Sequence, residues 1–167
     1  MVKLKRICGR AGAMALALVL MLTALAGCTS RADRENQRVI GESGGFDVLY
    51  EELRFVTLLV KDAMAGEYGA DIWKNADTAE QYRAELEERV MDKLRANYMV
   101  LATCAAYGIS TDSKEADNYV DRQIDQLITQ ECGGKTGKYK DYLKEHNLTD
   151  HYQRFALRVS YLESVLY

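Results

Sequence analysis

The chain contains no proline in its 167 residues. Proline fixes the backbone angle φ and lacks an N–H donor, so its absence leaves every segment free to continue as a helix. The chain is also rich in Glu, Lys, Ala, Leu and Arg, which are good helix formers. We therefore expect a mostly α fold.

Apolar residues recur at helical spacing in several segments, which Gly or polar connections separate. Before them, two short apolar pieces at 39–41 and 46–48 flank the Gly-rich residues 42–45, which predicts a short two-stranded hairpin. The expected helices cover about 50 to 64–68, about 79 to 107, from a cap at Thr111 or Asp112 to near Cys132, 138–146, and from a cap at Thr149 onward.

One of these helices, over 79–107, is expected to be long. Thr78 is placed to cap its N-terminus, and Gly108 is placed to end it. A helix of this length spans roughly 44 Å, so we expect it to project beyond a small core and expose apolar area. The inward stripe is expected to consist of Leu86, Val90, Leu94, Tyr98, Leu101 and Ala105.

The N-terminus has the features of an export signal. Basic residues within 3–10 precede an uncharged apolar run at 11–24, which is short for a membrane span of about 20 residues. The next residues, Leu25-Ala26-Gly27-Cys28, resemble the lipobox of bacterial lipoproteins. The resemblance implies that Cys28 receives a diacylglyceryl group and becomes the mature N-terminus. The protein would then be lipid-anchored to the cell membrane on its extracytoplasmic face.

This interpretation divides the chain into three parts. Residues 1–27 are expected to be a lipoprotein signal peptide, and residues 28–38 a solvated, lipid-anchored tether without apolar periodicity. Residues 39–167 are expected to form one helical domain, of a size that can bury a single core.

The charge of the chain beyond the signal peptide limits its partners. It has 18 Lys and Arg against 25 Asp and Glu, a formal charge of −7. This balance argues against nucleic acid as a partner. It also argues against electrostatic attraction to anionic lipid, so the acyl chains on Cys28 have to provide the anchor.

The sequence offers no recognisable catalytic, cofactor, metal or nucleotide site. Gly134-Lys135-Thr136 imitates the end of a phosphate-binding loop, but Thr129 stands where the pattern needs its first Gly, and a helix precedes it instead of a strand. His146 and His151 lack metal-ligand spacing, and we interpret them as solvated surface residues. We therefore expect no enzyme activity and no cofactor.

Other features have structural interpretations. Cys104 and Cys132 could form a disulfide in an oxidising compartment, but two buried thiols are the favoured interpretation. The acid pairs Glu51-Glu52 and Glu87-Glu88 are interpreted as solvated charged faces of helices. Trp73 is interpreted as a large apolar side chain that covers one end of the core. Some of the 11 tyrosines are expected to line a shallow groove for weak contact with unfolded chains.

A family resemblance rests on short segments that follow one another in a fixed order. They are Val39-Ile40-Gly41, Val48, Tyr50-Glu51-Glu52-Leu53, Ala106-Tyr107-Gly108-Ile109, Tyr119-Val120, Tyr142-Leu143, Leu148-Thr149, Arg154 and Tyr161-Leu162-Glu163. Behind a lipobox, this order resembles the N-terminal domain of SurA and PrsA-type lipoprotein foldases. The resemblance implies a chaperone-like domain that binds unfolded or exported polypeptides outside the cytoplasmic membrane.

The chain departs from that family in one respect. The family usually continues into a parvulin-type peptidyl-prolyl isomerase domain, and no segment here matches it. We expect either the N-terminal part of a longer foldase or a chaperone-like module alone, without isomerase residues. The alternative is a structural or adaptor lipoprotein that docks a partner protein through its helices. A transporter's substrate-binding lipoprotein is disfavoured, because those proteins are normally longer and α/β.

Replacing Cys28 tests the anchor. In Cys28→Ala no thiol can accept the lipid, so we expect the protein to be released or to accumulate at precursor size. Intact mass spectrometry of the membrane-extracted protein should show an acyl increment only in the wild type. A wild-type mass without that increment would contradict lipidation.

Overall fold

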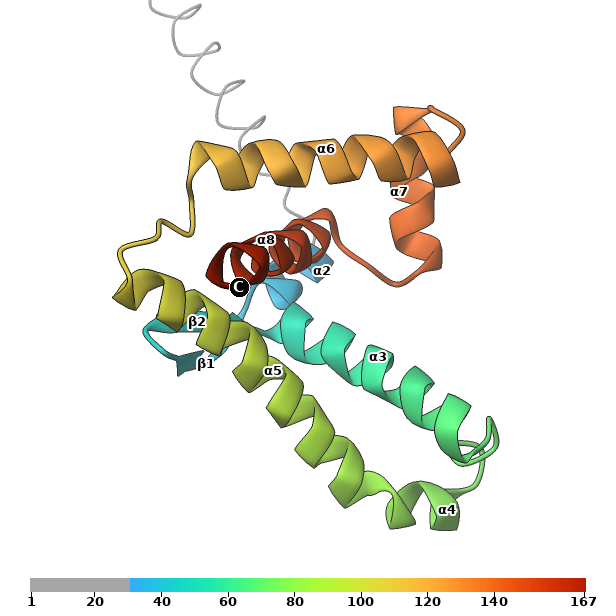
Figure 1. Cartoon of the computed structure of the whole chain (residues 1–167). Helices are drawn as coiled ribbons and strands as arrows, with labels where there is room; N and C mark the ends of the chain where they lie inside the picture. The colour runs from blue at the N-terminus through green and yellow to red at the C-terminus, as the bar shows by residue number, and fades with distance from the viewer. Residues whose placement is uncertain (1–30) are drawn as a thin grey trace, which may run out of the picture. The chain divides into compact units, whose positions relative to one another are not determined.

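The computed structural model describes residues 31–167, of which 36–167 form one compact unit (Figure 1). This part of the chain is mostly helical, as expected, with a short hairpin near its start. Cys28 and the expected signal peptide lie outside the described residues. The elements are α2 (Arg31–Asn36), β1 (Val39–Ser43), β2 (Phe46–Leu49), α3 (Tyr50–Tyr68), α4 (Ala76–Gln81), α5 (Arg83–Ala106), α6 (Lys114–Glu131), α7 (Thr136–Glu145) and α8 (Asp150–Leu166).

Helix α2 falls within the segment that the sequence predicted to be a solvated tether. A helix was not expected there, although residues 32–35 are exposed, as in a solvated segment. Asp33 lies in the first turn of α2 and Arg34 in its last turn. Both charges lie where the helix dipole favours them, which offsets the lack of an apolar face.

The expected hairpin is confirmed. Strands β1 and β2 pair antiparallel, with Ser43 opposite Phe46 and an irregularity between Val39 and Gly41. Gly44 and Gly45 form the turn with φ of 62° and 85°, the positive values that a tight two-residue hairpin turn requires. A Cβ on Gly44 would lie 2.9 Å from the Cβ of Ala102, so the turn lies directly against α5.

The expected long helix is interrupted at Tyr82, which separates α4 from α5. Asn75 caps α4 by accepting from the backbone N–H of Asp77 at 2.8 Å, whereas Thr78, the expected cap, donates to the Asn75 carbonyl. The Tyr82 ring stacks on Tyr68 at 4.9 Å between ring centroids. This aromatic packing is a tertiary contact that helical periodicity does not reveal, and it leaves α5 roughly 36 Å long.

The later helices follow the expected order with one changed cap. Helix α6 is capped by Ser113, which accepts from the Ala116 N–H at 3.1 Å, and not by Thr111 or Asp112. The Asp112 carboxylate instead pairs with Arg158 of α8 at 2.5 Å. Thr149 caps α8 as predicted, by accepting from the Tyr152 N–H at 3.0 Å.

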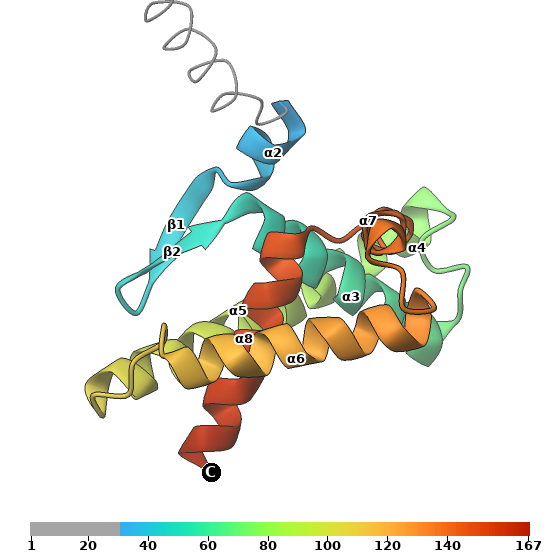
Figure 2. The same ribbon diagram turned by 90° about the horizontal axis from the view of Figure 1, so that it is seen from above.

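Two apolar clusters share α5. Figure 1 shows α3 and α5 side by side, and Figure 2 shows α6 lying across α8. The first cluster joins α3 to the N-terminal half of α5 and contains Val56, Val60, Met64, Ile72, Val90 and Leu94. The second joins α8 to the C-terminal half of α5 and contains Tyr98, Leu101, Cys104, Val159 and Leu162. Most of the expected stripe of this helix is therefore buried, although Ala105 is exposed and Cys104 takes its place.

Candidate functional site

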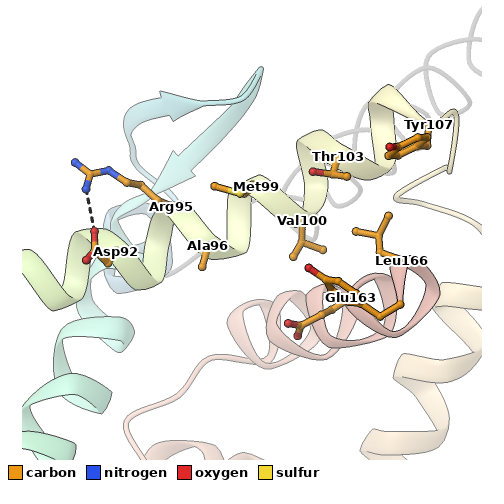
Figure 3. A pocket seen from close by; sticks show the side chains of 10 residues that line it. Asp92, Arg95, Ala96, Met99, Val100, Thr103, Tyr107, Glu163 and Leu166 are labelled. Carbon is orange, nitrogen blue, oxygen red and sulfur yellow. Dashed lines mark hydrogen bonds and ion pairs between the residues drawn. The ribbon is translucent and has the colours of Figure 1, made fainter.

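A groove lies between α5 and the C-terminal end of α8 (Figure 3). It encloses about 500 Å³, a volume within the range of small ligand sites. We call it the α5–α8 groove. Its lining residues are Asp92, Arg95, Ala96, Met99, Val100, Thr103, Tyr107, Glu163, Leu166 and Tyr167.

The apolar residues of this groove are unusually accessible. Met99 is 65% exposed and Tyr107 is 78% exposed. Met91 is also exposed, and eight residues turn an α-helix by about 80° beyond two full turns. Met91, Met99 and Tyr107, which lies just past the end of α5, therefore form an exposed stripe that winds around the outer side of the helix. The buried residues of α5 lie on the faces that contact α3 and α8, which leaves this stripe without an internal partner in the described part of the chain.

A second cavity adjoins the groove across Arg95. It encloses about 390 Å³ between the hairpin and α5, and Ile40, Met91 and Leu94 line it together with Arg95. Arg95 itself is paired with Asp92 at 3.0 Å and is largely exposed. Exposed apolar side chains therefore lie on both sides of the Asp92–Arg95 pair, between the hairpin and Tyr107.

Sequence reasoning named the inward stripe of this helix and missed the outward one. The signal was present: Met91, Arg95, Met99, Thr103 and Tyr107 follow one another at four-residue intervals. Two methionines and a tyrosine outside the inward apolar stripe indicate a second apolar surface.

A buried pair of carboxylates lies at the start of α3. Glu51 is 1% exposed and Glu52 is 2% exposed, so the interpretation of this pair as a solvated face is wrong. Glu87 and Glu88 are exposed, as that interpretation predicted for them. Glu52 lies one turn before the buried Val56, so the four-residue spacing of the apolar stripe already included it.

Glu51 connects α3 to the start of α8. Its Oε2 accepts from the Thr149 hydroxyl at 2.6 Å, and its Oε1 contacts Nδ1 of His151. The Glu51 carboxylate raises the pKa of His151, because a negative charge beside the ring favours the protonated imidazole. His151 is exposed, as the sequence suggested, and it is also an ion-pair partner of a buried carboxylate, which the sequence did not reveal.

Glu52 connects α3 to the hairpin and α5. It accepts from the Leu49 N–H at 3.2 Å and contacts the Tyr98 hydroxyl. Burial raises the pKa of Glu52. The Tyr98 hydroxyl also lies 2.9 Å from the Asp47 carbonyl. The Tyr98 hydroxyl is thus the donor that faces both the Glu52 carboxyl and the Asp47 carbonyl.

The contacts of the carboxylate pair hold several elements together. A cavity of about 270 Å³ reaches Glu52 and His151, with Thr111 and Arg158 also in its lining. Arg158 is already bound to Asp112 and to Asp117, the latter at 2.6 Å. The carboxyl groups of the pair are satisfied by the side chains of Thr149, His151 and Tyr98 and by the Leu49 N–H, which suits a structural connection.

The remaining predicted features have structural roles. Cys104 and Cys132 are buried free thiols, and burial raises the pKa of Cys104, which disfavours its reactive thiolate. Trp73 packs against the first cluster and donates its indole N–H to the Lys61 carbonyl at 3.0 Å. His146 packs on the Tyr142 ring at 4.3 Å between centroids.

Residues 31–167 contain neither an evident metal site nor a membrane-spanning helix. Within that range no group of three or more His, Cys, Asp or Glu side chains is arranged to bind a metal ion. None of the helices described there combines the length and apolar character of a membrane span.

Thr149→Val tests the connection between α3 and α8. Valine keeps the branched shape but removes both the cap of α8 and the hydroxyl donor to buried Glu51, so we expect a loss of about 1–3 kcal/mol in the free energy of unfolding. Ser113→Ala is the matched control, because it removes a cap that has no carboxylate partner and should cost about 1 kcal/mol. Urea titrations would measure both, and equal losses would show that the bond to Glu51 contributes nothing.

His151→Gln tests the ion pair through the pH dependence of stability. The folded chain holds the His151 proton more tightly than the unfolded chain. The stabilisation is therefore complete below the ordinary pKa of ~6.5 and is lost as pH rises through the raised pKa. We expect the wild type to lose stability from pH ~6.5 upward and the variant to lose less. Unfolding titrations across this range would show it. His146→Gln should follow the wild type, and a wild-type profile in His151→Gln would contradict the assignment.

The chain matches no protein-family model, no curated protein and no solved structure. The resemblance to SurA and PrsA-type foldases therefore rests on the segments of this sequence alone.

Proposed function

We propose that this protein is a chaperone-like lipoprotein that holds unfolded or exported polypeptides on the extracytoplasmic face of the cell membrane. Lipidated Cys28 provides the anchor, and residues 39–167 provide the binding domain. The proposal includes the likeness to the N-terminal domain of SurA and PrsA-type foldases and assigns no isomerase activity to these residues.

The observation that carries the proposal is the exposed apolar stripe on α5. Met91 and Met99 of α5, and Tyr107 just after it, are exposed and belong to neither apolar cluster. Contiguous exposed apolar surface usually marks an interaction site, because water around it is unfavourable. The stripe lines two adjoining cavities and so offers depressions for several side chains of a bound segment.

The side chains of the stripe suit partners of varied sequence. Methionine is unbranched and polarizable, so Met91 and Met99 can adapt to ligands of different shape. Tyr107 offers a large apolar ring with one polar tip. A surface of this kind favours weak contact with many apolar segments over one tightly matched ligand.

Aggregation assays test the proposal. We expect residues 29–167, which include the whole compact unit, to delay light scattering by a denatured test protein at near-stoichiometric ratios. ATP should not change the delay. The double variant Met99→Gln, Tyr107→Gln should lose most of the delay, because it removes the exposed apolar area of the groove.

Leu59→Gln is the matched control. Leu59 is an exposed apolar residue of α3 that lines neither cavity, so this variant should protect the test protein as well as the wild type. Circular dichroism would establish that all variants are folded. Unchanged scattering at a several-fold excess of folded wild type would overturn the proposal and favour the adaptor lipoprotein. Equal loss in the groove variant and the control would show that the groove is not the binding surface.

A further inference from the structure

The charges around the α5–α8 groove are unbalanced. Asp92 and Arg95 neutralise each other at 3.0 Å. Glu163, on the α8 side, is exposed and forms no side-chain hydrogen bond or ion pair within residues 31–167. The groove therefore combines an apolar lining with one uncompensated carboxylate, which Figure 3 shows beside Val100 and Leu166.

Two further acids extend this imbalance along α5. Glu88 lies one turn before Asp92 and is exposed, and Glu42 lines the adjoining cavity beside the hairpin. Neither has an ion-pair partner in the described part of the chain. The formal charge of −7 beyond the signal peptide acts in the same direction over longer distances.

The geometry points to unfolded polypeptide segments that carry Lys or Arg next to apolar residues as the preferred occupants of the α5–α8 groove. This inference rests on the proposed function and adds the class of segment. Apolar side chains would contact Ala96, Met99 and Val100, and the cation would lie near Glu163. Apolar burial would supply the affinity, and charge would select among segments, because exposed charges mainly affect specificity and association rate.

A second copy of this chain is a poorer occupant. In a two-fold dimer the same patch meets itself, so two surfaces that both carry excess negative charge would be brought together. Like charges facing each other disfavour such an interface. Anionic lipid is disfavoured by the same sign of charge.

Three fluorescently labelled peptides with one apolar core, flanked by Lys, Gln or Glu, test this inference by anisotropy on residues 29–167. We expect affinity in the order Lys, Gln, Glu, with Lys and Glu differing by roughly tenfold at low salt and by less at 1 M salt, where screening is strong. Glu163→Lys should remove most of the preference. Glu131→Lys makes the same charge change on α6, outside the groove lining, and should keep most of it.

The outcomes separate this inference from the proposed function. Equal affinities for the three peptides, all abolished by Met99→Gln, Tyr107→Gln, would overturn the charge preference and leave polypeptide binding in place. Failure of all three to bind would overturn both. A dimer in sedimentation that Met99→Gln dissociates would identify a second copy as the occupant and overturn the inference.

Discussion

The arrangement of the elements depends on two carboxylates taken out of water at the start of α3. Burying a carboxylate is costly unless hydrogen bonds or charges replace its hydration. Glu51 obtains them from Thr149 and His151 at the start of α8, and Glu52 from Leu49 and Tyr98. These contacts fix β2, α3, α5 and α8 relative to one another, because the buried side chains have few alternative hydrogen-bond partners. Apolar packing alone is less directional, so the pair specifies how the helices meet and not merely that they meet.

Features set by local sequence could be predicted. The Gly44-Gly45 turn needs positive φ, and Thr149 is followed by an amphipathic segment, so the hairpin and the start of α8 were identified correctly. Features set by distant contacts could not. The expected long helix is interrupted at Tyr82, whose ring stacks on Tyr68. The Asp112 carboxylate does not cap α6 and instead pairs with Arg158, which lies 46 positions away.

The candidate site shows the same division. The amphipathic pattern indicated which face of α5 is buried, but whether the opposite face was covered depended on where the hairpin, α3 and α8 lie. Glu51 and His151 are 100 positions apart in the sequence, and nothing local to either residue marks the other as its partner. Glu51 and Glu52 lie at positions that continue the buried stripe of α3, but because they are charged they were interpreted as solvated. A charged residue in line with buried apolar positions indicates a buried ion pair as readily as a solvated edge.

Helix α5 belongs to both apolar clusters, with Leu94 in the first and Tyr98 in the second, one turn apart. Both clusters therefore depend on the same helix, and neither is expected to stay folded without the other. If α3 unfolds, the N-terminal turns of α5 lose their packing partner. We expect those turns to unfold as well, because short unsupported helices are marginal in water. Because α5 is one continuous helix, positions eight residues apart along it stay about 12 Å apart, which fixes the spacing of the contacts that a bound segment can make. A bound segment would therefore have to adapt its own conformation to that fixed spacing.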